Sequence, residues 1–203
     1  MEARHSAYES GQPIQYLYFP LTGVISIVSV TQDGRSVEIA TVGNEGVVGL
    51  PLFLGSQTVL GQAYAQVPGE SLRVKAAIFQ REVRKSRPLT TILHLYTHAL
   101  LVQISQGMVC NRIHSVTERC ARWLLMTHDR VRMDSFMLTQ ESLGYMLGVR
   151  RTGASEVASA LRKRGLIDYS RGSVQVRNRR GLESVSCECY RVVKREFDRL
   201  FGE

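Results

Sequence analysis

The sequence predicts an α+β protein whose β-rich N-terminal part is followed by helices. Residues 14–75 contain short β-branched and aromatic runs separated by glycine-containing breaks, which is typical of strands. From about residue 76, apolar residues instead recur at three- and four-residue spacing, which is typical of helices. Residues 139–167 read as two short helices joined by a tight turn. We therefore expect a small β-barrel or jelly roll, a long helix and a C-terminal helical domain.

The strands of the N-terminal part are bounded by turn residues. The Asp-Gly pair within residues 32–35 favours a hairpin, and Pro68-Gly69 favours a second turn. Glycines interrupt the chain repeatedly between residues 43 and 61. The expected strands are residues 14–19, 23–30, 36–42, 64–67 and 71–75.

A long helix is expected after a short helix over residues 76–84. Pro88 opens it, because proline is tolerated in the first turn of a helix. Its apolar face is too wide for a strict coiled-coil seam, so one side is expected to pack on the β-domain and the other on a second copy. A single buried core helix is the alternative. The residues expected at the dimer contact are Leu93, Tyr96, Leu100, Gln103 and Gly107.

The C-terminal helical pair has the features of a winged helix-turn-helix. A helix is expected over residues 115–128, followed by a polar link over residues 129–135. Thr139 is a good N-cap for the first helix of the pair, and Gly148 suits a sharp turn at positive φ, with Val149 packed between the helices. The second helix is expected over residues 151–164, ended by Gly165. A hairpin over residues 166–177, the wing, and a final helix over residues 181–201 complete the domain.

The positive charge of the chain is concentrated around this helical pair. The formal net charge is +8, and residues 150–180 alone carry nine basic and two acidic side chains. A surface that binds a polyanion concentrates charge in this way, whereas a solvated charge run is the alternative. A helix-turn-helix can place its second helix in the major groove of DNA. Double-stranded DNA is therefore the expected partner.

Several other classes of function lack support in the sequence. No apolar run is long enough to span a membrane and the N-terminus has no signal-peptide core, so we expect a cytoplasmic protein. No phosphate-binding glycine loop or nucleophile elbow is present, so we expect no enzyme, no catalytic residue and no cofactor. His94 and His98 share a helix face, but packing or solvent contact is favoured over a metal.

The four cysteines are expected to be buried structural thiols. They are Cys110, Cys120, Cys187 and Cys189. The single residue between Cys187 and Cys189 is too short for a usual zinc knuckle, so no metal site is expected. A redox or metal role is the alternative.

Residues 138–167, LTQESLGYMLGVRRTGASEVASALRKRGLI, resemble the helix-turn-helix of the Crp/Fnr family of bacterial transcription regulators. The β-rich segment also resembles that family's effector domain, through Thr22-Gly23-Val24 and Gly43-Asn44-Glu45-Gly46. The resemblance implies a cyclic-nucleotide-binding-like β-roll over residues 1–87, here expected to lack some of its first elements. It further implies a dimerisation helix over residues 88–112 and a winged helix-turn-helix over residues 113–203.

The family's base-reading positions fall on Arg151, Thr152 and Glu156. An arginine can donate two hydrogen bonds to guanine, and a glutamate can accept one from cytosine. Thr152 and Glu156 depart from the residues of the cyclic-AMP receptor protein, so the resemblance implies a different DNA site. Contacts with the DNA backbone are expected from Thr139, Arg150, Ser155, Lys163 and Arg171.

The expected effector pocket departs from that of cyclic-nucleotide binders. Those relatives hold the phosphate with an arginine, whereas no arginine lies between Arg35 and Arg73 here. A buried phosphate without a cation is costly, so cyclic AMP is disfavoured as the effector. The N-terminal cysteines of the oxygen-sensing branch are also absent. The pocket is expected at Gly46, Gly49, Leu50, Leu60 and Gly61.

Together these features predict a homodimeric, sequence-specific DNA-binding transcription regulator. Its recognition helix, residues 151–164, would read a pseudo-palindromic operator, and RNA polymerase and an unidentified small-molecule effector are the further expected partners. The alternative is a ligand-sensing module of the same fold that does not bind DNA.

Overall fold

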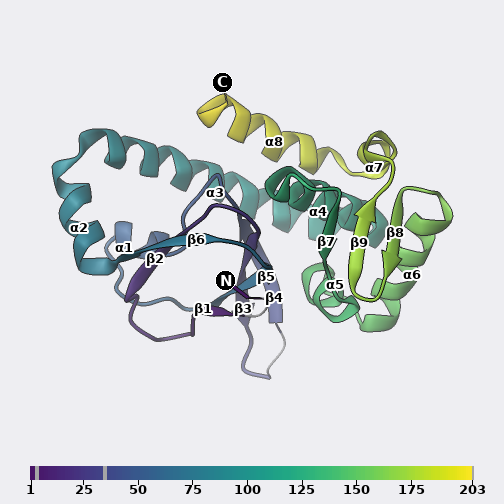
Figure 1. Ribbon diagram of the computed structural model, residues 1–203, viewed down its shortest axis with the longest axis horizontal. Helices are drawn as coiled ribbons and strands as arrows, with labels where there is room; N and C mark the ends of the chain where they lie inside the picture. Colours follow the sequence, from purple (N-terminus) through teal and green to yellow (C-terminus); the bar gives the residue numbers. More distant parts are fainter. Residues whose placement is uncertain (3–4, 34–35, 203) are drawn as a thin grey trace.

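The N-terminal part is an antiparallel β-roll, seen in the computed structural model of residues 1–2, 5–33 and 36–202 (Figure 1). One sheet has the order β1-β5-β3-β4 and the second pairs β2 with β6. The expected strands are all present, and β1 and the short helix α1 are additional. Gly34 and Arg35 of the predicted hairpin lie outside the described residues. The strands are β1 (Ser6–Tyr8), β2 (Tyr16–Pro20), β3 (Val24–Val30), β4 (Ser36–Val42), β5 (Gln62–Val67) and β6 (Ser71–Lys75), and α1 is Leu50–Phe53.

The predicted long helix is α3 (Arg87–Ile113), which follows α2 (Ala76–Lys85). Ser86 caps it, because its hydroxyl accepts a hydrogen bond from the Leu89 amide at 3.3 Å. Pro88 lies in the first turn, as expected, where no intrahelical donor is needed. Tyr96 and Leu100 project from α3 into the core of the β-roll.

The residues expected at the dimer contact lie instead on the inner face of α3. Leu93, Tyr96, Leu100 and Gln103 are buried within the chain itself, and Gly107 is half-buried. The exposed apolar residues lie on another face of α3, one position after the expected ones: Leu101 is 58% exposed and Met108 is 65% exposed. Three- and four-residue spacing fits both faces, so the spacing alone does not say which face the β-roll covers.

The C-terminal domain begins with α4 (Val116–Val131), which has a capping box formed by Ser115 and Glu118. The predicted polar link differs, because α4 continues through residues 129–131 and Ser135 already belongs to a strand. This strand, β7, joins the predicted wing in a sheet of order β7-β9-β8. The remaining elements of the domain are β7 (Ser135–Met137), α5 (Gln140–Leu147), α6 (Arg151–Lys163), β8 (Ile167–Ser170) and β9 (Ser173–Val176).

The prediction of a single final helix is wrong, because the chain forms two helices. These are α7 (Arg179–Val185) and α8 (Glu188–Phe201). Ser186 and Cys187 have extended backbone, with ψ of 149° and 163°, and this breaks the helix. Helix α8 turns back along α3 (Figure 1), and Phe197 packs against both the β-roll core and the C-terminal core.

Within the described residues, no helix combines the length and the apolar character that crossing a membrane requires.

Candidate nucleic-acid interface

The turn between α5 and α6 forms as the sequence predicts. The Thr139 hydroxyl accepts a hydrogen bond from the Ser142 amide at 3.1 Å and so caps α5. Gly148 ends α5 with φ of 63°, in the left-handed region that favours glycine. Val149 packs against the C-terminal core, and its side chain lies where a Cβ at position 153 of α6 would come into van der Waals contact with it. These local features fix the angle at which α6 leaves the turn.

Helix α6 has one buried face and one free face. Ala154, Val157 and Leu161 lie in the core of the domain. Because residues three and four apart share a helix face, burial of these positions leaves the opposite side open. The three expected base-reading residues, Arg151, Thr152 and Glu156, are all exposed there.

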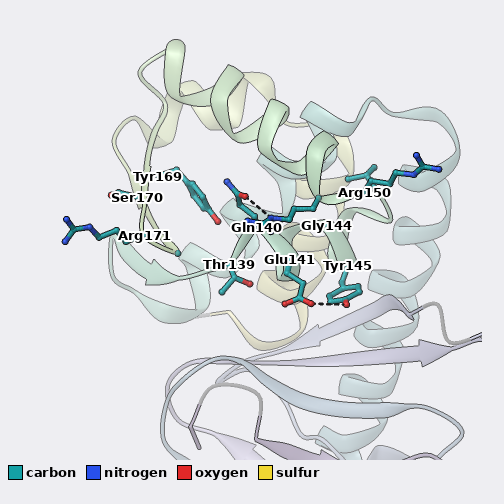
Figure 2. Close-up of a pocket in the computed structure, with 12 residues that line it drawn as sticks. Thr139, Gln140, Glu141, Gly144, Tyr145, Arg150, Tyr169, Ser170 and Arg171 are labelled. Carbon is teal, nitrogen blue, oxygen red and sulfur yellow. Dashed lines mark hydrogen bonds between the residues drawn. The ribbon is translucent and has the colours of Figure 1, made fainter.

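A groove of about 920 Å³ runs between the starts of α5 and α6 and the tip of the wing (Figure 2). Arg150, Arg151 and Arg171 line it together with the capping residue Thr139. The Arg151 Nε donates to Gln140 Oε1 at 3.3 Å, which holds the guanidinium beside the start of α5. The structure thus brings four of the eight expected DNA-contacting residues around one groove.

The wing tip and the first helix are tied by a further contact. Tyr169 of β8 donates a hydrogen bond from its hydroxyl to the Leu138 carbonyl at 2.8 Å, just before α5. Arg171, with φ of 49°, and Gly172, with φ of 76°, form the turn of the wing. The Tyr169 hydrogen bond therefore ties the wing, which carries Arg171, to the start of α5.

Among the basic residues between positions 150 and 180, some are held in ion pairs within the chain and others are free. Asp168 pairs with Arg162 and Arg177 at 3.4 and 3.1 Å, so it neutralises part of that side. In the part of the chain that the structure describes, six basic residues between positions 150 and 180 form no ion pair with a carboxylate: Arg150, Arg151, Lys163, Arg164, Arg171 and Arg180. Five of these free cations lie on the helix, turn and wing that carry the groove, whereas Arg180 lies on α7.

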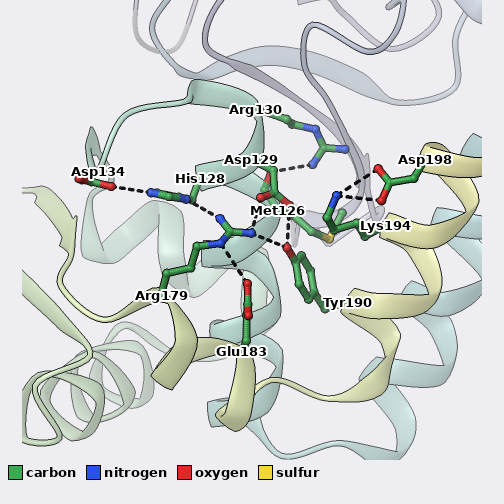
Figure 3. Close-up of polar contacts among 10 residues, drawn as sticks. All are labelled: Met126, His128, Asp129, Arg130, Asp134, Arg179, Glu183, Tyr190, Lys194 and Asp198. Carbon is green, nitrogen blue, oxygen red and sulfur yellow. Dashed lines mark hydrogen bonds and ion pairs between the residues drawn. The ribbon is translucent and has the colours of Figure 1, made fainter. Parts of the chain in front are cut away.

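Arg179 belongs to the structural group (Figure 3). Its guanidinium contacts Asp129 at 2.6 Å, Glu183 at 3.0 Å and the Tyr190 hydroxyl at 2.7 Å. Tyr190 also donates to Asp129 at 2.9 Å, and burial raises the pKa of this phenol, with the Asp129 charge adding to the effect. The network joins α4, α7 and α8, so the basic count of the sequence overstated the charge available to DNA.

A second network joins the C-terminal domain to the β-roll through Arg130, which Figure 3 shows without its partners in the β-roll and α3. Arg130 of α4 is 8% exposed; it donates from Nε to Glu45 at 2.8 Å and from Nη1 to the Thr41 hydroxyl at 3.0 Å. Its Nη2 donates to Gln103 of α3 at 2.9 Å, and Gln103 donates to the Thr41 carbonyl at 3.0 Å. The β-roll, α3 and the C-terminal domain are therefore joined through the Arg130 guanidinium.

Glu38 forms another contact between the domains. Its carboxylate accepts hydrogen bonds from Ser26 and, at 2.9 Å, from the indole of Trp123. Burial raises the pKa of Glu38 to about 7, against the lowering effect of these hydrogen bonds and of the Arg122 and Arg130 charges. The contact between β4 and α4 therefore contains a carboxyl group that titrates near neutral pH.

The β-roll and α3 border a cavity of about 420 Å³ that is partly open to solvent. Four of the five expected effector residues line it: Gly49, Leu50, Leu60 and Gly61. Gly46 lies elsewhere, with its backbone against the Tyr96 ring, where no side chain would fit. One wall comes from α3, through Thr97, Leu100, Leu101 and Ile104. No described lining residue carries a charged side chain.

Several site residues were not foreseen from the sequence. Gln140 stands eleven positions before Arg151, and neither periodicity nor spacing relates the two. Tyr169 reads as an ordinary wing residue, and Arg130 as one more exposed charge in a polar link. His94 and His98 have separate partners, because the His94 ring packs at a tilt against the Phe53 ring and His98 pairs with Glu196 at 2.8 Å. These contacts join residues that are distant in the sequence, so the three-dimensional structure is needed to find them.

Two family models match this chain. Residues 2–86 match the cyclic nucleotide-binding domain, and residues 118–185 match the Crp-like helix-turn-helix domain. Among curated proteins, no sequence matches the chain significantly.

Similar solved structures extend over nearly the whole chain. FixK2 from Bradyrhizobium japonicum is 20% identical with a TM-score of 0.77, covering 91% of this chain and 94% of FixK2. TTHB099, a transcriptional regulator of the CRP family from Thermus thermophilus, is 17% identical with a TM-score of 0.76, covering 92% and 95%. The cyclic di-GMP-responsive regulator CLP from Xanthomonas campestris is 19% identical with a TM-score of 0.68, covering 87% and 91%. The predicted fold class is confirmed.

A β-roll joined through a long helix to a winged helix-turn-helix defines a class of DNA-binding transcription regulators. The chain belongs to the Crp/Fnr family within that class.

Proposed function

We propose that the protein is a homodimeric regulator that reads a pseudo-palindromic operator with α6 of each copy. The observation that carries the proposal is the free face of α6, where Arg151, Thr152 and Glu156 are exposed beside a groove lined by further free arginines. A helix of this kind fits the major groove, and two related by a twofold axis read two half-sites about one helical turn apart. A purely ligand-sensing module would not need unpaired cations at these positions.

The roles of the free cations follow from their positions. In this proposal Arg151, at the start of α6, donates to a guanine, and Thr152 and Glu156 read adjacent positions. Arg171 at the wing tip, Lys163 at the end of α6, and Arg150, Thr139 and Ser155 are assigned to phosphates, which set register but carry no sequence information.

The experiment is equilibrium binding to operators selected from a random DNA library, measured over a range of salt concentrations. Lys163→Ala should weaken binding to all sequences alike and flatten the salt slope by about one unit, whereas Arg151→Ala should relax preference at one base pair. Arg84→Ala, which removes an exposed arginine of α2, is the matched control and should change neither. Absence of salt-dependent DNA binding by the wild-type protein would refute the proposal.

We infer that α3 contributes the dimer contact through its exposed face. His94, Thr97, Leu101, Ile104 and Met108 follow one another at three- and four-residue spacing, one position on from the buried set. This spacing is that of a coiled-coil seam, in which apolar residues meet those of a second helix. A second copy of α3 is the occupant that the twofold symmetry of an operator requires.

The effector that fits the β-roll cavity is an uncharged, largely apolar small molecule. The lining is apolar apart from hydroxyl, amide and main-chain groups, so a phosphate would lose its hydration without gaining a cation. The cyclic di-GMP response of the Xanthomonas regulator is therefore not extended to this chain. Calorimetry should detect no binding of cyclic AMP or cyclic GMP, and micromolar binding of either would overturn the inference.

The cavity and the proposed dimer seam share Thr97, Leu101 and Ile104. A ligand in the cavity would therefore touch the helix face on which the second copy packs. Contact of the DNA-bound dimer with RNA polymerase is the remaining proposal, supported by the family alone; co-sedimentation of the polymerase with the dimer on operator DNA would test it.

A further inference from the structure

Three thiols and one imidazole meet where α3 ends and α8 begins. Cys110 lies in the last turn of α3 and His114 is its C-cap, while Cys187 is the N-cap of α8 and Cys189 lies in its first turn. The three sulfur atoms and one imidazole nitrogen all lie within 4.8 Å of one another. Each cysteine is at most 4% exposed. The residues come from segments more than seventy positions apart, so sequence spacing did not reveal them.

The distances approach those of a tetrahedral metal site. With zinc–sulfur bonds of about 2.3 Å, two sulfur ligands lie about 3.8 Å apart, and a sulfur and a nitrogen lie slightly closer. Cys110 Sγ and Cys187 Sγ are 3.4 Å apart, and Cys189 Sγ and His114 Nδ1 are 3.6 Å apart. The remaining pairs of ligand atoms lie within 4.8 Å of each other, about 1 Å beyond that spacing at most.

The orientation of His114 distinguishes the cluster from simple packing of thiols. Its Nδ1 faces Cys189, while its Nε2 lies 3.2 Å from the Glu188 carboxylate. A carboxylate on the outer nitrogen is the usual arrangement around a metal-binding histidine, because it fixes the tautomer that leaves the inner nitrogen free to coordinate. Buried cysteines that only fill space do not require this contact.

The surroundings also compensate the charge that such a site would carry. Three thiolates and a neutral imidazole around a divalent ion leave one net negative charge. The N-terminus of the fourteen-residue α8 faces it with free amide groups and a positive dipole end. Arg122 of α4 acts electrostatically on both Cys110 and Cys189, and its Nη1 is buried without a hydrogen-bond partner among the described residues.

We propose that Cys110, His114, Cys187 and Cys189 bind one Zn²⁺ per chain as a structural Cys₃His site. Four protein ligands leave no open position, so the ion would be structural and not catalytic. It would fasten α8 to the end of α3, at the point where the chain passes into the C-terminal domain. All four ligands lie outside the two segments that match family models, residues 2–86 and 118–185.

The first test uses the wild-type chain and needs no variant. Metal analysis of protein purified under reducing conditions should give one equivalent of zinc. Titration of the metal-free protein with Co²⁺ should give the intense visible bands of tetrahedral thiolate coordination, and Zn²⁺ should displace them. Absence of these bands from the reduced protein would overturn the proposal. A Cys110–Cys187 disulfide in the isolated protein, with no metal uptake after reduction, would do so as well.

Variants then test the ligand set. His114→Gln and Cys189→Ser should each lower Zn²⁺ affinity at least tenfold, measured by competition with a chelating dye. Cys120→Ala, at a buried cysteine outside the cluster, and His98→Gln, at an exposed histidine, are the controls and should retain one equivalent. Undiminished affinity in both ligand variants would refute the assignment. Because the readout is metal binding, its result is independent of whether the chain binds DNA.

Discussion

Replacing Arg130 by methionine should lower the free energy of unfolding by removing the buried contact between the β-roll and the C-terminal domain. Methionine keeps most of the length of the side chain but removes the donors to Glu45, Thr41 and Gln103. Breaking a buried ion pair by removing one partner costs about 3–5 kcal/mol, because the other charge stays behind. Glu45 retains 20% side-chain exposure, so we expect the lower end, about 3 kcal/mol.

The assay is urea unfolding followed by Trp123 fluorescence and by circular dichroism. Trp123 is the only tryptophan of the chain and lies on α4 beside the β-roll, so it reports this contact directly. The double variant Arg130→Met/Glu45→Gln leaves no unpaired charge and should recover at least half of the loss. Arg132→Gly changes an exposed arginine with φ of 52° and should be neutral or slightly stabilising.

The reasoning would be refuted by a loss below about 1 kcal/mol in Arg130→Met, the size expected for an ordinary hydrogen bond. It would equally fail if the double variant were no more stable than the single one, because the cost would then not come from the stranded Glu45 carboxylate.

Three further predictions concern other parts of the molecule. The Glu38 pKa of about 7 exceeds its unfolded value, so its stabilising effect is complete at low pH and is lost as the pH rises through 7. Wild-type protein should therefore lose about 1 kcal/mol more than Glu38→Gln between pH 6 and pH 8 in urea titrations, and parallel pH profiles would contradict this. Leu101→Asp should shift the protein from dimer to monomer in sedimentation equilibrium, whereas Met133→Asp, at an equally exposed residue away from α3, should not; an unchanged dimer would exclude this helix face. Gly46→Ala should lower the free energy of unfolding by at least about 2 kcal/mol, because the added Cβ would lie 2.4 Å from the Tyr96 ring; a neutral effect in denaturation would show that the loop yields freely.

Local signals in the sequence predicted the helix-turn-helix closely. Thr139, Gly148 and Gly165 act through the conformation of their own backbone and its nearest amides, and each sits where the sequence placed it. The free face of α6 follows from the same local pattern. The predicted roles of Arg151, Thr152 and Glu156 remain proposals, because they depend on DNA.

Contacts between distant segments were beyond the reach of the sequence. The apolar positions of α3 fit two faces equally well, and only the position of the β-roll decides which is covered. The break between α7 and α8 has no glycine or proline to mark it; Ser186 and Cys187 adopt extended backbone where α8 turns back along α3. The cysteine cluster depends on that same reversal.

The segment over residues 43–50 contacts two different parts of the molecule. Its first half receives Arg130 against Gly43 and the Tyr96 ring against Gly46. Its second half, from Val47 to Leu50, is a wall of the β-roll cavity. A molecule that enters the cavity therefore pushes on the same short piece of backbone that holds both the long helix and the C-terminal domain. Only a few peptide bonds separate the two halves of this segment. A displacement of its backbone by a bound molecule would therefore reach Tyr96 of α3 and Arg130 of α4 directly.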